Sequence, residues 1–180
     1  MGMLDGKAAL VMGGTSGIGR AAAVALAHAS ARVVVADRRD AEGQETVRQV
    51  EAAGGTGLFV RTDVASEDEV QALVERVVRA YGRLDCAFNN AGFEGTAAPV
   101  DAATAAHYDE VMNVNLRGVW LAMKHEVPAL RAAGGGGIVN TSSIAGVVGF
   151  PGFSAYAAAK GGVIAMSARS PSSRPGQASA

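Results

Sequence analysis

The sequence has little cysteine, few aromatic residues and almost no net charge. One cysteine, Cys86, among 180 residues excludes a disulfide framework and a metal cluster built on thiolates. A formal net charge of −1 leaves no electrostatic footprint for nucleic acid. No apolar run is long enough to span a bilayer, and the first residues lack the apolar segment of a signal peptide. We therefore expect a cytoplasmic protein with neither a nucleic acid nor a membrane as its partner.

Histidine is also scarce, and His28, His107 and His125 share no ligand-like spacing, so we predict no metal site. Small and apolar residues are abundant instead. The chain is 49% hydrophobic and contains 24 glycines. Long alanine-rich helices packed closely on a sheet would produce this composition.

Short apolar runs alternate with longer stretches of high helical propensity. We expect strands at residues 7–12, 32–36, 57–61, 84–88 and 138–142, and helices at about 21–28, 40–53, 67–81 and 101–132. Pro128 is expected to kink or end the last of these helices. Four crossover helices between five strands predict an α/β fold with a parallel, doubly wound sheet between two layers of helices.

A glycine-rich turn follows the first expected strand at once and opens the first helix. Gly13, Gly17 and Gly19 give the spacing Gly-x3-Gly-x-Gly, with Thr15, Ser16 and Ile18 between them. Glycines let the backbone approach a pyrophosphate, and a helix N-terminus offers free N–H groups and the positive end of a dipole. The alternative is a plain strand-to-helix turn.

Acidic and amide residues stand at the ends of three further strands. Asp37 lies about 20 residues after the glycine turn, which suits a hydrogen bond to an adenosine ribose; the alternative is a helix N-cap. Arg38 could face a 2′-phosphate, but Ser16 is neutral, so we favour NAD over NADP. Asp63, followed by Val64, either caps the helix starting near Ser66 or borders an adenine. The amide and small residues that end the fourth strand suit a ligand crevice, although they also suit a simple turn: Asn89, Asn90, Ala91 and Gly92.

Tyr156 and Lys160 are four residues apart, so on a helix their side chains share one face. An ammonium beside a phenol favours the phenolate. Ser143, delivered by the end of the fifth strand, could hold a substrate oxygen against that phenol. The arrangement predicts a proton-transfer site.

These motifs occur together and in order, and residues 3–167 resemble the short-chain dehydrogenase/reductase family. The resemblance implies a Rossmann fold with strand order 3-2-1-4-5-6-7, a nicotinamide dinucleotide, and hydride exchange with an alcohol or carbonyl. It implies that Tyr156 is the general acid/base, that Lys160 binds the nicotinamide ribose, and that Ser143 (Ser142 as the alternative) bonds the substrate oxygen. Asn115 would hold a water linking Lys160 to solvent. The residues implied for the dinucleotide are Gly13, Thr15, Ser16, Gly17, Ile18, Gly19, Asp37, Arg38, Asp63, Val64, Asn90, Ala91, Gly92, Tyr156 and Lys160.

The chain departs from the family at its end and at two inner positions. Met12 stands where threonine is usual, and Ser30 stands where a helix-ending glycine is usual. After Ser167 the expected continuation of the family stops. Pro171 and Pro175 follow, and neither proline can lie in the interior of a helix. A shifted reading frame, a short isoform or an error in the recorded sequence would each produce this ending. We expect an incomplete Rossmann domain over 1–169, lacking the last two strands of the family, and a disordered tail over 170–180.

Three functions remain open. The first is an NAD-dependent oxidoreductase acting on a small alcohol, polyol, sugar or ketone. The second is a truncated, catalytically incompetent nucleotide-binding remnant of such an enzyme. The third is an interaction module that uses the helix at 101–132, which in intact relatives contributes to a homo-oligomer.

Overall fold

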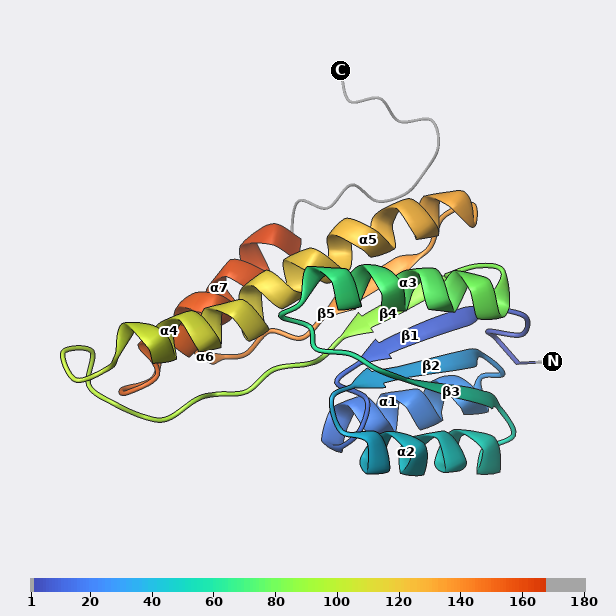
Figure 1. Ribbon diagram of the computed structural model, residues 1–180, viewed down its shortest axis with the longest axis horizontal. Helices are drawn as coiled ribbons and strands as arrows, with labels where there is room; N and C mark the ends of the chain where they lie inside the picture. The colour runs from blue at the N-terminus through green and yellow to red at the C-terminus, as the bar shows by residue number, and fades with distance from the viewer. Residues whose placement is uncertain (1, 168–180) are drawn as a thin grey trace, which may run out of the picture.

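The computed structural model describes residues 2–167 and has one parallel five-stranded sheet (Figure 1). Its strands lie in the order β3-β2-β1-β4-β5, and every neighbouring pair is parallel. This confirms the predicted doubly wound fold. The expectation for 170–180 lies outside the described residues. The strands are β1 (Ala8–Met12), β2 (Arg32–Asp37), β3 (Thr56–Arg61), β4 (Cys86–Asn89) and β5 (Gly137–Asn140).

The helices agree with the predicted ranges within a few residues, except in the long one. That helix begins at Ala105, because Thr104 caps it by accepting a hydrogen bond from the His107 backbone N–H. No helix in residues 2–167 has the length and apolarity needed to cross a membrane. The elements are α1 (Gly17–His28), α2 (Asp40–Ala52), α3 (Glu67–Tyr81), α4 (Ala105–Met112), the π-helical η1 (Asn113–Arg117), α5 (Gly118–Ala132), α6 (Ala145–Val148) and α7 (Ser154–Ser167).

Pro128 does not end its helix, so that alternative of the prediction is wrong. Helix α5 continues through Pro128 to Ala132. A proline leaves the carbonyl four residues earlier, here that of Lys124, without its N–H partner. Both residues lie on the exposed side of α5, where water can satisfy this carbonyl.

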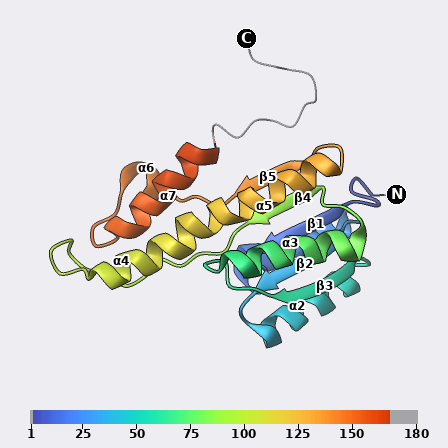
Figure 2. The same ribbon diagram turned by 45° about the horizontal axis from the view of Figure 1, so that its top comes forward.

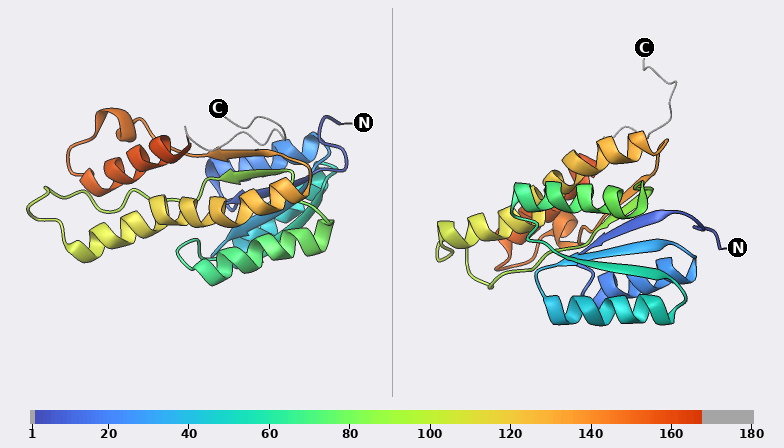
Figure 3. Two further views of the ribbon diagram at one scale, coloured as in Figure 1. Left: turned by 90° about the horizontal axis from the view of Figure 1, so that it is seen from above. Right: turned by 45° about the vertical axis from the view of Figure 1, so that its right-hand side comes forward.

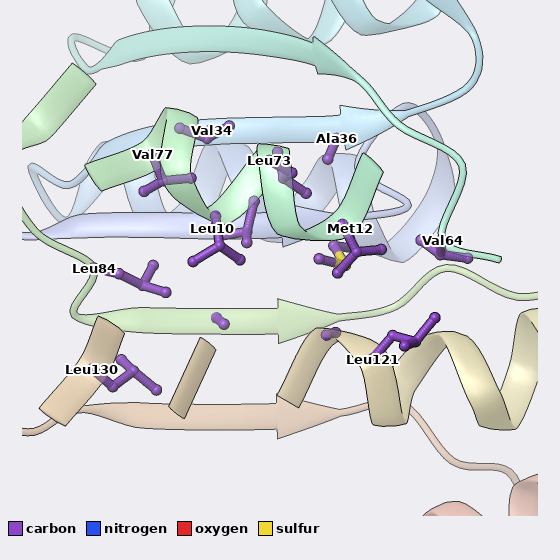
Figure 4. Close-up of a cluster of buried hydrophobic side chains, with 14 residues drawn as sticks. Leu10, Met12, Val34, Ala36, Val64, Leu73, Val77, Leu84, Leu121 and Leu130 are labelled. Atoms are coloured by element: carbon purple, nitrogen blue, oxygen red, sulfur yellow. The ribbon is translucent and has the colours of Figure 1, made fainter. Parts of the chain in front are cut away.

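The core consists of two layers, one on each face of the sheet. Alternate residues of β1 point to opposite faces: Leu10 and Met12 toward α3 and α5, Ala9 and Val11 toward α1 and α2. Figure 4 shows the first layer, in which Leu73 and Val77 of α3 and Leu121 and Leu130 of α5 cover the sheet. Because both faces of β1 are covered, the strand is apolar throughout, as parallel sheets require.

Ser30 occupies a position that favours glycine, as expected from its departure from the family. Its φ is +72°, and it is the single non-glycine residue with positive φ among residues 2–167. Helices α2 and α5 end the same way, with glycines at the equivalent positions: Gly54 with φ +84° and Gly134 with φ +93°. A serine in this left-handed conformation lowers the folding stability by about 1 kcal/mol relative to a glycine at the same position.

Helices α4, α6 and α7 form a lobe beyond the carboxyl ends of the strands (Figures 2 and 3). The continuous run α4–η1–α5 connects the two parts, since α5 packs on the sheet and α4 packs on α7. The carboxyl edge of the sheet therefore lies between the helix that opens at the glycine turn and the helix that carries Tyr156.

Candidate active site

A cavity of about 600 Å³ lies at the carboxyl ends of the strands. Eleven of the residues predicted for the dinucleotide line it, and Thr15 and Gly19 of the same glycine turn are buried. Four lining residues were not predicted: Arg39, Thr62, Phe93 and Val114. The eleven predicted lining residues are Gly13, Ser16, Gly17, Ile18, Asp37, Arg38, Asp63, Val64, Asn90, Ala91 and Gly92.

The glycine turn is packed so closely that side chains have no room. Gly13 has φ +71°, and a Cβ there would lie 2.6 Å from the backbone of Ala91. A Cβ on Gly19 would collide with the Gly13 carbonyl. Asn90 donates from Nδ2 to this same carbonyl at 3.2 Å, which ties the end of β4 to the turn. Two of the three glycines thus serve the close approach of helix and strands.

The N-terminus of α1 faces the cavity without a competing anion. Its N-cap residue, Ser16, makes no side-chain capping hydrogen bond, and the first turn contains no acidic residue. Gly17 and Ile18, which begin the helix, both line the cavity. The free N–H groups and the positive dipole end of α1 can therefore bind an anionic ligand.

Asp37 lies at the end of β2, where it was predicted, but it is already bonded to neighbours. Its carboxylate accepts hydrogen bonds from the Thr15 hydroxyl and from Arg39. Burial acts to raise the pKa of Asp37, but the hydrogen bonds from Arg39 and Thr15 outweigh it and lower the pKa overall. The N-cap of α2 is Arg39, so the alternative of Asp37 as a helix cap is wrong.

Asp63 borders the same cavity and also shapes the chain before α3. Its Oδ1 accepts from the Ala65 backbone N–H at 3.0 Å, while Ser66 supplies the side-chain cap of α3. Arg38 lies across from it, with Nη1 3.8 Å from Asp63 Oδ2. Asp63 therefore contributes charge to the cavity wall and does not cap the helix itself.

Lys160 is buried on α7, one turn after Tyr156. Its Nζ lies 5.7 Å from the centre of the Tyr156 ring and donates to the Thr141 carbonyl at 2.8 Å. Burial lowers the pKa of Lys160. A Cβ on Gly92, which lines the cavity, would lie 3.4 Å from this Nζ. Lys160 Nζ thus lies near the Tyr156 ring on α7 and also near Gly92 in the cavity wall.

The two serines after β5 have different partners. Ser142 donates from Oγ to the Lys160 carbonyl at 2.8 Å, which ties its hydroxyl to α7. Ser143 accepts at Oγ from the Ala145 backbone N–H at 3.2 Å, and its hydroxyl proton can still be donated to a ligand. This difference favours Ser143 over Ser142 as the residue that contacts a substrate.

Asn115 lies in η1 and pairs with the chain that leaves β4. Its Nδ2 donates to the carbonyls of Phe93 and Val111 at 2.8 and 2.9 Å, and its Oδ1 accepts from the Phe93 N–H at 3.1 Å. These bonds explain a fully buried asparagine within a helical run. They hold the cavity wall next to Gly92. The predicted water between Lys160 and solvent stays a prediction.

A second cavity, of about 270 Å³, lies beside Tyr156 in the lobe. It is formed by the segment after β4, the start of α4 and the start of α7. Its polar wall includes Glu94, His107 and Tyr108, and Phe153 contributes an apolar ring. This space can hold a small molecule in contact with Tyr156, which is one of its lining residues. Among residues 2–167 no group of three histidine, cysteine or acidic side chains could hold a metal ion.

The family model for short chain dehydrogenases matches residues 7–171. A 3beta-hydroxysteroid dehydrogenase of Mediterraneibacter gnavus is 41% identical over 89% of this chain and 58% of its own. A cyclohexanol dehydrogenase of Acinetobacter sp. is 40% identical over 90% of this chain and 64% of its own. The chain spans 58 to 66% of the length of the curated relatives it matches.

Comparison with solved structures also identifies dehydrogenases and reductases as similar proteins. The crystal structure of levodione reductase has a TM-score of 0.88 and 37% identity, covering 91% of this chain and 64% of that one. NAD+-bound xylitol dehydrogenase has a TM-score of 0.89 and 34% identity, covering 91% of this chain and 63% of that one. The five-stranded sheet and its helices are therefore shared with these proteins.

Proposed function

Because the chain belongs to the short-chain dehydrogenase family, we propose that it is an oxidoreductase that exchanges a hydride between a nicotinamide dinucleotide and a small alcohol or carbonyl compound. One observation carries the proposal. The glycine turn, the uncapped start of α1 and Asp37 share a cavity of about 600 Å³ whose wall at Gly92 adjoins Lys160. An elongated ligand with a phosphate centre and a ribose at each end fits these residues.

The position of each residue would decide which part of the dinucleotide or substrate it contacts. The N-terminus of α1 would hold the pyrophosphate, Asp37 the adenosine ribose, and Lys160 the nicotinamide ribose. When bound, the dinucleotide accepts or supplies the hydride. In the oxidation of an alcohol, Tyr156 would take the hydroxyl proton, Lys160 would stabilise the resulting charge and Ser143 would orient the oxygen.

NAD is the proposed cofactor. Asp37 places a carboxylate where a 2′-phosphate would need a cation, and the solved xylitol dehydrogenase contains NAD+. The proposed substrates are small alcohols, polyols, sugars or ketones. The cavity of about 270 Å³ beside Tyr156 would hold them, and relatives named for cyclohexanol, levodione and xylitol support this class.

The homo-oligomer was expected of intact relatives only, and for this chain nothing tests it. An apolar groove of about 700 Å³ lies between η1, α5 and α7, with half of Trp120 exposed. A second copy of the chain could cover this groove.

Turnover of secondary alcohols is the first expected result. We expect the NADH absorption band to grow when the chain is incubated with NAD and a panel of cyclic alcohols, polyols and sugars. Omitting the alcohol should leave the band flat. Binding of NAD without growth of the band for any alcohol would instead favour the nucleotide-binding remnant.

A further inference from the structure

Thr141, the residue that follows β5, bonds two different parts of the site. Its hydroxyl donates to Asn90 Oδ1 at 3.1 Å, and its carbonyl accepts from Lys160 Nζ at 2.8 Å. Its backbone N–H donates to the Asn89 carbonyl at 2.9 Å, which fixes the residue beside the end of β4. Thr141 lines neither cavity, so it can act on a ligand only through the residues that it bonds.

The side-chain amide of Asn90 carries the connection from Thr141 to the glycine turn. Its Oδ1 accepts from the Thr141 hydroxyl, while its Nδ2, the other end of the same amide, donates to the Gly13 carbonyl at 3.2 Å. Nδ2 also lies close to the start of α1, since a Cβ on Gly19 would be 2.9 Å from it. The amide is therefore in place to hold the turn against the helix that would receive a pyrophosphate.

The Thr141 hydroxyl keeps this amide in one orientation. The two ends of an asparagine amide are similar in size, but one donates hydrogen bonds and the other accepts them. The Gly13 carbonyl requires the Nδ2 end, and the Thr141 hydroxyl then satisfies Oδ1. Without the hydroxyl, Oδ1 would lose this partner in a half-buried position, and the amide would be free to turn away from Gly13. Met12, which precedes the turn, is buried among apolar side chains and has no hydroxyl to take over this role.

We propose that Thr141 is a positioning residue for the dinucleotide, because its hydroxyl holds the Asn90 amide against the glycine turn while its carbonyl holds Lys160. The proposal rests on the proposed function, since it concerns how the same cavity receives its ligand. It gives a role to a residue that the sequence analysis left without one. The carbonyl belongs to the backbone, so a substitution of the side chain tests the hydroxyl and leaves the bond to Lys160 in place.

The test is a fluorescence titration with NADH of the native chain, Thr141→Val and Thr141→Ser. Valine keeps the branched shape of threonine but lacks the hydroxyl, so Thr141→Val should bind NADH about three- to tenfold more weakly. Serine keeps the hydroxyl, so Thr141→Ser should bind NADH within about twofold of the native affinity. The matched control is Thr56→Val, which removes a hydroxyl at the exposed start of β3, outside both cavities, and should keep the native affinity.

Asn90→Ala provides a second test, because it removes the amide through which the hydroxyl would act. In this background, adding Thr141→Val should change the NADH affinity by less than about twofold. Chemical denaturation checks the fold of each variant. If Thr141→Val does not fold, Thr141→Ala replaces it, since alanine and serine differ by the hydroxyl alone.

Four outcomes would overturn the proposal. Native affinity in Thr141→Val would show that the hydroxyl is not needed, and an equal loss in Thr141→Ser would show that side-chain packing matters instead. A further loss of about threefold or more on adding Thr141→Val to Asn90→Ala would show that Thr141 acts independently of Asn90. If the native chain does not bind NADH, the dinucleotide site of the proposed function is itself refuted, and the positioning role with it.

Discussion

Tyr156→Phe is expected to lower kcat by about 10²- to 10⁴-fold while leaving the affinity for NADH nearly unchanged. The variant removes one oxygen, the group that would exchange the substrate proton. The ring remains, so α7 should still place Lys160, whose Nζ lies 5.7 Å from the ring centre. Initial rates of NADH formation and a parallel NADH titration measure the two quantities.

The control for this variant is Tyr81→Phe. Tyr81 ends α3, half-buried, with the Arg32 guanidinium 5.1 Å from its ring centre, and it lines neither cavity. The same loss of a hydroxyl there should leave kcat within about twofold of the native value. A Tyr156→Phe variant that kept native turnover would show that another group moves the proton.

Glu126→Gln is expected to stabilise the fold by roughly 3 kcal/mol above about pH 8 and to flatten its pH dependence. Glu126 is fully buried on α5, and its Oε2 accepts from Asn89 Nδ2 at 3.0 Å. Within residues 2–167, its other oxygen and Asn89 Oδ1 have no hydrogen-bond partner. Burial raises the pKa of Glu126 to about 7, although the Asn89 hydrogen bond opposes this.

The sign of the pH effect follows from this raised pKa. Between the usual glutamate pKa of about 4.3 and the folded value of about 7, the folded chain holds a proton that the unfolded chain has lost. Stability contributed by Glu126 is therefore fully present at low pH and falls as pH rises through this window. Glutamine is neutral at every pH, so the fall should disappear.

Chemical denaturation at about pH 5 and about pH 8 measures the effect of Glu126→Gln. The control is Glu110→Gln, which changes an exposed glutamate on α4 and should keep the native pH dependence. Equal free energies of unfolding for the native chain and Glu126→Gln at about pH 8 would contradict this prediction, because the buried carboxylate would then not lower the stability of the fold.

Much of the fold follows from local pattern. The strands were predictable because each is a short apolar run, and β1 is buried on both faces. The order β3-β2-β1-β4-β5 agrees with the family resemblance, which also placed Tyr156 and Lys160 on one helix. Periodicity alone would not have supplied the strand order, since pairing depends on contacts far apart in the chain.

The unpredicted features depend on side-chain contacts between distant segments. Asn115 pairs with the backbone of Phe93, 22 residues away, and nothing in the local sequence indicates that partner. Arg39 was given no role from the sequence, yet its guanidinium bonds Asp37, Thr15 and Ser16. Pro128 suggested a kink or an end of the helix, but the helix continues, and the exposure of Pro128 makes the missing hydrogen bond tolerable. Composition does not encode such pairings.

NADH binding to the native chain and to Ile18→Asp tests the central claim, that the start of α1 is a dinucleotide site. Ile18 is 70% exposed in a first turn without acidic residues, so aspartate there should preserve or slightly raise stability through the helix dipole. The same charge would repel a pyrophosphate. We expect saturable binding to the native chain and at least about tenfold weaker binding to Ile18→Asp, with the unfolding free energy undiminished. Equal NADH affinity in the two proteins, or none in the native chain, would contradict the account.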